Sequence, residues 1–267
     1  MKKYRSFFRI RFAAGMQYRA AAWAGIATQA AWGAMEILMF RAFYAGDPAG
    51  FPMTFAQLSG YVWLQQALLA MFMTWYYDSE IFEHITGGSI AYELCRPCDL
   101  YTMWFVKNAA ARMSRAALRS GPILLVAALL PAPYGLRLPA DAMAAALFVP
   151  ALVLGFLVVV AFSMLVYISA FYTVSADGVK ILVTSVLEFF TGGVIPIPFF
   201  PVWLQRVVYA LPFGSMQNMP YLIYTGQLAG TAALKGLALQ LAWLAVLLTA
   251  GKLWMGRAMN KVVVQGG

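Results

Sequence analysis

No charged residue interrupts the stretch Ala142–Ala176, which reads AMAAALFVPALVLGFLVVVAFSMLVYISAFYTVSA. A transmembrane helix needs about 20 consecutive apolar residues, so this stretch is long enough to cross a bilayer even when it is tilted. A helix with so little polar surface would have to be buried on every side in a soluble protein. The stretch therefore predicts an all-α integral membrane protein.

The composition of the whole chain supports this fold class. Of its 267 residues, 63% are hydrophobic and 11% are charged, whereas a soluble globular domain carries about 25% charged residues. A soluble protein of this size leaves much of its surface in water and could not hide so many apolar side chains. The length suits a single transmembrane domain, 1–267.

Long intervals without charge predict six membrane spans. They are Ala20–Phe40, Phe55–Tyr77, a third from near Arg112 to Leu136, Ala142–Ala176, Val179–Ile195 and Gly230–Trp254. The apolar segment Pro196–Tyr224 contains five prolines, which prevent one continuous helix. We expect it to form short re-entrant helices between spans 5 and 6, because irregular backbone is tolerated at membrane depth where protein buries it. The alternative is a seventh crossing.

Basic residues set the orientation of these spans. Fifteen Lys and Arg residues lie in the N-terminal segment, the loops after spans 2 and 4, and the C-terminal tail; the other side carries Arg41, Arg137, Arg206 and Lys235. The basic side is cytoplasmic, so both termini are expected there. The basic residues flank apolar stretches and do not form one patch, which argues against nucleic acid as a partner despite the net charge of +9.

The N-terminal segment 1–19 has the pattern of an interfacial helix. At helical spacing, one stripe contains Tyr4, Phe8 and Phe12 and the adjoining stripe contains Lys2, Arg5 and Arg9. Aromatic and basic stripes side by side suit a helix that lies among lipid headgroups. The alternative is a plain basic flank of the first span.

The loop 78–111 contains the signals of a short cytoplasmic helix. Gly87-Gly88-Ser89 is a helix start, and Pro97 ends the helix. Ile90, Ala91 and Leu94 are expected to share one face, and Asp99 can cap a second helix that climbs into span 3. A mixed-charge helix here could receive mechanical work from a cytosolic partner; the alternative is an ordinary connector.

This loop carries few residues suited to catalysis or metal binding. Cys95 and Cys98 form C-R-P-C, but no βαβ pattern surrounds them, so we expect two free thiols. His84 is the single histidine, which leaves a metal site or a catalytic triad poorly supported. We predict no catalytic, cofactor-binding or metal-ligating residue in this chain.

The residues Gly87-Gly88-Ser89-Ile90-Ala91-Tyr92-Glu93-Leu94-Cys95-Arg96-Pro97, followed by Asp99-Leu100-Tyr101, resemble a signature of bacterial ABC-transporter permeases. The signature, G-x-I-A-Y-x-L-x-R-P-x-x-L-Y, belongs to the type 2 exporter superfamily, which includes permeases for polysaccharide, teichoic acid and anthracycline export. A second resemblance comprises Gly192–Pro201, Leu211-Pro212-Phe213 and Pro220–Gly226. Cys95 and Cys98 depart from the aliphatic residues expected at their positions.

The resemblance implies a role for each part. The coupling helix that sits in a groove of the ATPase would comprise Gly87, Gly88, Ile90, Tyr92, Glu93, Leu94, Arg96 and Pro97. The outer gate would comprise Pro196, Pro198 and Pro201 in the re-entrant segment 196–224. Two permease subunits, identical or different, and two P-loop ATPase subunits would form the working unit. ATP and Mg would bind to the partner, because no G-x-x-x-x-G-K-[ST] motif occurs in this chain.

Two acidic residues lie within predicted spans, where a charge costs about 2.5–3.5 kcal/mol on insertion scales. Glu36 is five residues from Arg41, and we expect an interfacial pair between them. Glu188 has two possible roles. It could hydrogen-bond the partner permease or one of the glutamines of spans 1 and 2, or it could line a translocation path with Gly192 and Gly193 and contact a polar or cationic part of a substrate.

The sequence and the resemblance together predict the permease subunit of an ATP-driven ABC exporter in the bacterial cytoplasmic (inner) membrane. ATP hydrolysis is expected on a separate chain, so the chain itself is not expected to be an enzyme. The many aromatic residues favour an amphipathic or lipid-like substrate, and membrane lipids are expected partners. The alternatives are an ATP-independent carrier driven by an ion gradient and a membrane scaffold or sensor that transports nothing.

Overall fold

The computed structural model describes residues 2–47, 50–173 and 176–260, in which helices are joined by turns and loops and no strand occurs. The longest helices are α2 (Arg19–Gly46), α6 (Leu100–Leu129), α7 (Ala142–Ser169) and α11 (Gly230–Met259). Shorter ones are α1 (Lys2–Gly15), α3 (Phe55–Phe72), α4 (Ser79–Thr86), α5 (Ile90–Leu94) and α8 (Ala176–Phe190). The predicted all-α class is confirmed.

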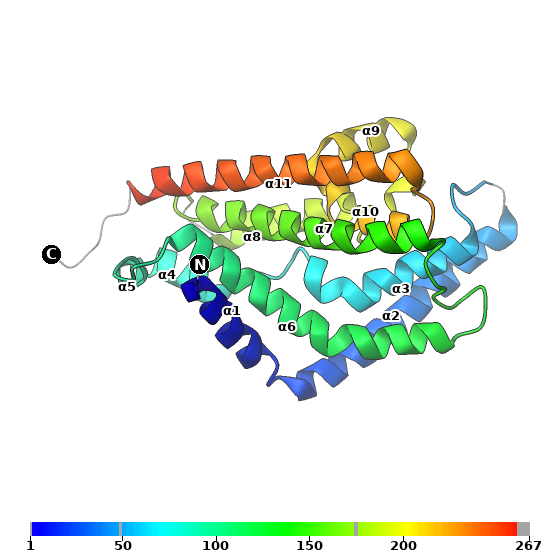
Figure 1. The fold of residues 1–267 in the computed structure, drawn as a ribbon, viewed down its shortest axis with the longest axis horizontal. Helices are drawn as coiled ribbons and strands as arrows, with labels where there is room; N and C mark the ends of the chain where they lie inside the picture. The colour runs from blue at the N-terminus through cyan, green and yellow to red at the C-terminus, as the bar shows by residue number, and fades with distance from the viewer. Residues whose placement is uncertain (1, 48–49, 174–175, 261–267) are drawn as a thin grey trace.

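The long helices run side by side along the molecule (Figure 1). The beginning of α1, the short helices α4 and α5, and the end of α11 gather at one end of this bundle. The remaining short elements lie toward the other end: η1 (Ile197–Phe199), α9 (Val202–Ala210), η2 (Pro212–Ser215) and α10 (Asn218–Tyr224). The segments that the charge distribution assigns to the cytoplasm therefore share one end of the molecule.

Six helices coincide with the predicted spans, namely α2, α3, α6, α7, α8 and α11. Among the described residues, α7 and α11 are the two helices that are long and apolar enough to cross a membrane by length and composition alone. Helix α8 has 15 residues, which gives about 22 Å at 1.5 Å per residue, against about 30 Å of hydrocarbon. The assignment of six spans stays a prediction.

Several predicted boundaries were wrong, including the end of span 4, because α7 ends at Ser169 and not at Ala176. Helix α3 ends at Phe72 and not at Tyr77, and α8 ends at Phe190 and not at Ile195. Shortly after α8, Gly192 turns the chain with φ of 79°. Helix α6 ends at Leu129, before two prolines that cannot continue it, and not at Leu136. Its start agrees with the expected cap, because an Asp99 oxygen accepts a hydrogen bond of 2.8 Å from the backbone nitrogen of Thr102.

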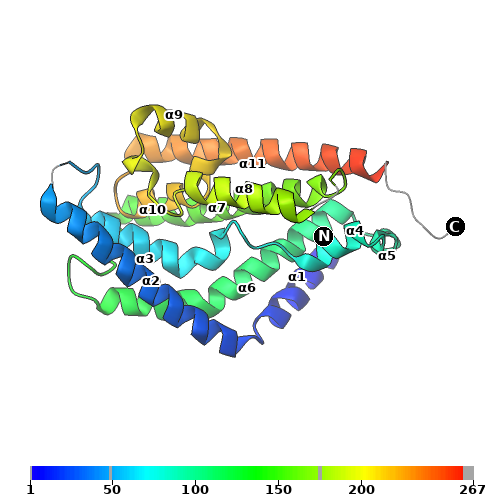
Figure 2. The ribbon, with the colours of Figure 1, turned by 180° about the vertical axis from the view of Figure 1, so that it is seen from behind.

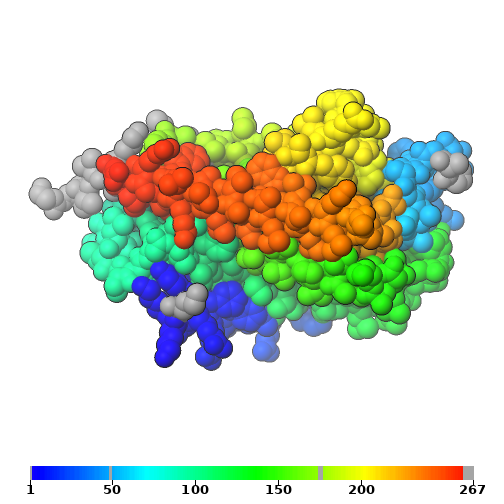
Figure 3. Space-filling view, turned by 45° about the horizontal axis from the view of Figure 1, so that its top comes forward, coloured from blue at the N-terminus to red at the C-terminus, as the bar shows by residue number. Residues whose placement is uncertain are grey.

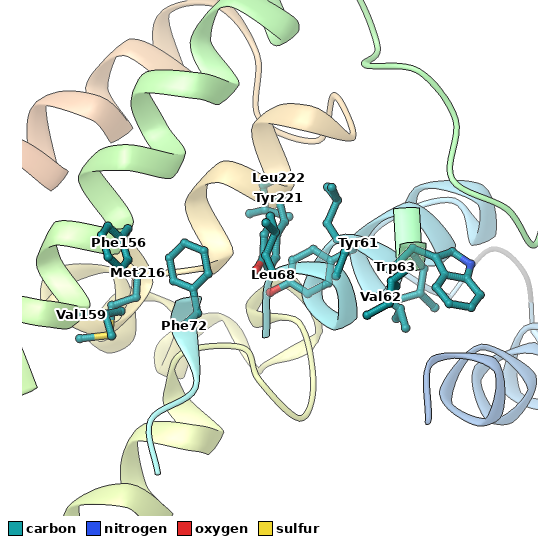
Figure 4. Packing of buried hydrophobic residues seen from close by; sticks show 14 of the residues in the cluster. Tyr61, Val62, Trp63, Leu68, Phe72, Phe156, Val159, Met216, Tyr221 and Leu222 are labelled. Carbon is teal, nitrogen blue, oxygen red and sulfur yellow. The ribbon is translucent and has the colours of Figure 1, made fainter. Parts of the chain in front are cut away.

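Large buried side chains join α3 to the segment between α8 and α11. The rings of Tyr61 on α3 and Tyr221 on α10 lie 5.3 Å apart between centroids, edge to face. Phe72 packs against the same Tyr221 ring, and Phe156 of α7 belongs to the same cluster (Figure 4). Six of the seven residues of α10 are buried. Helix α10, at the end of the segment that follows α8, is therefore part of the core.

Apolar side chains also cover the outside of the bundle. Exposed examples on four different helices are Trp23, Val153, Leu182 and Leu241. In Figure 3, α11 runs along the surface in orange and red, with the yellow α9 segment protruding beside it. An outer surface with this much exposed apolar area matches lipid better than water.

Candidate functional site

The predicted coupling helix is shorter in the structure than the sequence suggests. Ser89 is the N-cap of α5, which agrees with the predicted start, but α5 contains only Ile90–Leu94 and ends before Pro97; a separate helix, α4, precedes it. Gly88 separates the two with φ of 72°, a backbone conformation that side-chain-bearing residues rarely adopt. Helix α4 was not predicted, although Asp78 gave a signal for it: this residue caps α4 by accepting a hydrogen bond of 3.0 Å from the Glu80 nitrogen.

The side chains of α5 point in two directions. Ile90 is 2% exposed, and the buried Glu93 carboxylate forms an ion pair of 3.2 Å with Arg96. Tyr92 is 76% exposed and Leu94 is 45% exposed. The sequence predicts that Leu94 shares one face with Ile90. The structure shows instead that Leu94 lies outside the buried face. Arg96 and Pro97 are exposed just beyond the helix, and Cys95 and Cys98 are free thiols.

A buried lysine attaches α4 to the bundle. The Lys107 ammonium lies 2.6 Å from a Glu80 oxygen and 3.0 Å from an Asp78 oxygen. Arg11 of α1 lies 3.6 Å from the same Glu80 carboxylate. The hydrogen bond from Lys107 lowers the pKa of Glu80, with smaller favourable contributions from the charges of Lys107 and Arg11 and an opposing effect of burial. These contacts connect α1, α4 and α6 at the end of the bundle that carries α5.

This bridge predicts a pH dependence. Because the pKa of Glu80 is lower in the folded protein than its ordinary value of 4.5, the bridge stabilises α4 above that pH and is lost as the pH falls through the folded pKa. We expect amide exchange of Ser79–Thr86 to rise when the protein is acidified below this range. In Lys107→Met the exchange should be fast already at pH 7, as measured by hydrogen–deuterium exchange and mass spectrometry. Unchanged protection in that variant would contradict the role of the bridge.

A second buried cation, Arg112, lies five residues further along α6, about one and a half helical turns from Lys107. Its side chain is fully buried and has no carboxylate partner among the described residues. The guanidinium donates hydrogen bonds to the backbone oxygens of Met71 (3.2 Å), Met73 (2.7 Å) and Tyr76 (3.1 Å), and to the side chains of Asn108 (2.7 Å) and Ser163 (3.2 Å). Arg112 thus ties the end of α3 to α6 and α7.

A cavity of about 620 Å³ lies between α2, α3 and the end of α8. Figure 2 shows these three helices on the same face of the bundle. The polar lining residues are Thr28, Gln29, Glu36, Gln65, Gln66 and Glu188, and the larger apolar ones are Trp32, Met35, Met39, Leu69, Trp75 and Val194. The lining therefore combines two carboxylates and three amides with aromatic and thioether surface, and it includes no basic residue.

Glu36 faces this cavity and not Arg41. Its carboxylate accepts a hydrogen bond of 3.4 Å from the Gln66 amide, while the Arg41 guanidinium lies 5.2 Å from the centre of the Tyr134 ring. The expected interfacial pair between Glu36 and Arg41 was therefore wrong. One Glu36 oxygen and the side-chain oxygens of Gln29 and Gln65 are buried without a hydrogen-bond partner.

The structure brings two of the three residues predicted for a translocation path into the cavity lining, Glu188 and Gly193. Gly192 lies behind them, where its carbonyl oxygen accepts a hydrogen bond of 3.1 Å from the Tyr61 hydroxyl. A Cβ atom at Gly192 would lie 2.7 Å from that hydroxyl, so only glycine fits. Their role in translocation stays a prediction.

The prolines assigned to the outer gate lie at the starts and ends of short helices. Pro196 precedes η1, and Pro201 precedes α9. The Gln205 amide donates hydrogen bonds to the carbonyl oxygens of Pro198 (3.0 Å) and Phe200 (2.8 Å), which fixes the turn between η1 and α9. The turn therefore follows the C-terminal end of α8, the end that lines the cavity. The gating role of the three prolines stays a prediction.

A family model described as ABC-2 family transporter protein matches residues 30–266. The chain belongs to this family. The match includes α5, the cavity residues Glu36 and Glu188, and the whole outer segment. A comparison with curated proteins gives no match.

Membership makes this chain an ABC-2 permease, a membrane component of a transporter. The family also implies association with ABC ATPase partners. In the described part of this permease, no three His, Cys, Asp or Glu residues are grouped so that they could hold a metal ion.

Proposed function

We propose that this ABC-2 permease is the membrane-spanning subunit of an ATP-driven exporter in a bacterial cytoplasmic membrane, and that the cavity between α2, α3 and α8 is part of its substrate path. The observation that carries the proposal is the polar lining of this cavity, which includes two carboxylates from predicted membrane spans. Two carboxylates in membrane-crossing segments are costly unless they face water or protein, and such residues commonly mark transport pathways.

The face that contains the cavity also suits a second permease. The exposed apolar side chains beside it are Trp32, Met35 and Met39 on α2, and Ile181, Leu182 and Val186 on α8. A second subunit placed against these helices would enclose the cavity on its open side. Identical and different second subunits satisfy this geometry equally.

Exposed α5 is the element that we assign to ATPase coupling. Its connection to the bundle is mechanical: Lys107 links α4 to α6, and Arg112 links α6 to the end of α3, which lines the cavity. A displacement of α4 and α5 by a partner ATPase would therefore be transmitted through α6 to α3. Mg and ATP would bind to the partner chain, where ATP hydrolysis would supply the free energy for transport.

The proposal is tested by co-purification in mild detergent followed by reconstitution into vesicles. We expect a P-loop ATPase to co-purify and transport to require ATP hydrolysis. A chain that transports alone when an ion gradient is applied would instead be a secondary carrier. A complex with no substrate-dependent activity under either condition would favour a scaffold or sensor.

Glu188→Gln tests the substrate path directly. The change keeps the size of the side chain and removes its charge, so we expect ATP-dependent transport to fall about tenfold, the effect of about 1.4 kcal/mol, while ATPase association is kept. Asp177→Asn is the matched control, because this acid is also on α8 but its side chain is 80% exposed and lies outside the cavity lining. Equal transport by the two variants would remove Glu188 from the path.

A further inference from the structure

A second cavity lies at the junction of α1, α2 and α6, on the side of α6 that faces the α1–α2 turn, and it measures about 490 Å³. Four basic residues line it, Arg11, Lys107, Arg115 and Arg119, with Asp78 as the acid. The apolar part of the lining includes Ala14, Ala21, Ala22, Ala111 and Leu118. The cavity thus has a strongly basic part and an apolar part, the two chemistries of a phospholipid.

Two of these cations are not neutralised. Lys107 is compensated by Asp78 and Glu80, and Arg11 approaches Glu80 as well. Arg115 and Arg119 form no ion pair with any carboxylate of the described residues. They are four residues apart on α6, a spacing at which like charges are neighbours and repel each other. An anion between them would remove that repulsion.

Local contacts hold both guanidinium groups at the cavity. The Arg115 guanidinium lies 3.8 Å from the centre of the Tyr76 ring. The Arg119 guanidinium lies 3.5 Å from the Ala21 carbonyl oxygen and packs against Gly25, where a Cβ atom would lie 2.6 Å from the guanidinium carbon. Both arginine side chains are half-buried, so part of each charge remains open to a ligand.

The close packing of three helices gives this cavity its shape. A Cβ atom at Gly15 would lie 2.1 Å from the Ser114 hydroxyl, so glycine lets the end of α1 rest directly on α6. The chain then turns into α2, whose first-turn amides receive no side-chain hydrogen bond from the N-cap residue Tyr18. The positive end of this helix adds to the field of the two arginines.

We propose that this cavity binds the phosphate headgroup of an anionic phospholipid of the inner leaflet. Helix α1 carries aromatic and basic side chains, and α2 starts the first predicted span, so the turn between them lies at the depth of the lipid headgroups. The planar guanidinium of an arginine can donate two parallel hydrogen bonds to one phosphate group. The alanine and leucine side chains of the cavity provide apolar contact for the glycerol and the first acyl carbons. The site does not depend on the proposed transport activity.

Native mass spectrometry of the full chain in detergent tests the proposal, with phosphatidylglycerol and phosphatidylcholine of identical acyl chains as probes. We expect the wild type to bind phosphatidylglycerol about 30-fold more tightly, since each of the two arginines contributes about 1 kcal/mol near an anionic group. The double variant Arg115→Gln/Arg119→Gln should lose this preference. The matched control Arg5→Gln/Arg9→Gln removes the same charge from α1 outside the cavity and should keep it.

The single variants Arg115→Gln and Arg119→Gln are measured as well, so that the result does not depend on a double variant that fails to fold. Each single variant should reduce the preference for phosphatidylglycerol. Inorganic phosphate is added as a competitor. Equal binding of both lipids by the wild type, an equal loss in the control pair, or complete displacement of the lipid by millimolar phosphate would overturn the proposal. The last outcome would identify a site for a soluble anion.

Discussion

Replacement of Arg112 by methionine is expected to destabilise the protein by at least about 3 kcal/mol, because it leaves several buried hydrogen-bond acceptors without a donor and each costs about 1–3 kcal/mol. Methionine fills a similar volume but donates nothing. The carbonyl of Met71 is in the last turn of α3, where helix carbonyls have no intrahelical partner, and Met73 and Tyr76 lie in the connection that follows. All three oxygens accept a hydrogen bond from the Arg112 guanidinium, which methionine cannot replace.

The measurement is thermal unfolding of the purified chain in detergent, followed by size-exclusion chromatography with intrinsic fluorescence. Arg137→Met is the control, since Arg137 is an exposed basic residue in the loop after α6. Arg112→Lys should recover part of the lost stability, because an ammonium carries the charge but cannot reach five acceptors with a planar fork. A melting curve of Arg112→Met that overlays the wild type would show that Arg112 does not hold α3 and α6 together.

Tyr92→Asp is expected to weaken ATPase association by about 30-fold, which corresponds to about 2 kcal/mol. Tyr92 is the most exposed aromatic side chain of α5, and exposed tyrosines are frequent contributors to binding energy at protein interfaces. The same exposure means that the substitution removes few contacts within the permease, so its melting temperature should not change.

Tyr92 is a better probe than a charge reversal at Glu93 and Arg96. Glu93 is buried and paired with Arg96, so reversing both would disturb α5 itself. Trp203→Asp is the matched control, because Trp203 is an aromatic residue on α9, 66% exposed, away from α5. Association is measured by titration of the purified ATPase against the detergent-solubilised permease. Equal affinity for the wild type and Tyr92→Asp would exclude α5 as the coupling element.

The sequence predicted the helical class and the broken helices of the segment Pro196–Tyr224. The apolar stretch that begins at Ala142 became α7, and the prolines of Pro196–Tyr224 produced short helices instead of one span. Asp99 was recognised as a helix cap and is one. These features depend on residues close together in the chain, so local propensities and periodicity are sufficient to predict them.

The errors arose where a local pattern was overruled by packing. The helix predicted over Gly87–Pro97 begins after its N-cap Ser89, as expected, but it ends at Leu94 and does not continue to Pro97. Leu94 has the right spacing to share a face with Ile90, yet Glu93 is the residue that turns inward because Arg96 can pair with it. In so short a helix, one ion pair and one buried isoleucine decide the orientation.

The sequence by itself determined that this chain is a helical membrane protein with two acids, Glu36 and Glu188, in apolar segments, because composition and charge spacing are local properties. Only the tertiary structure decided which groups they meet. Glu36 lies five residues from Arg41, about one and a half helical turns, so the two point to different sides of α2. Packing of α3 and α8 against α2 then places both acids in one cavity, and contacts between distant parts of a chain cannot be deduced from spacing along it.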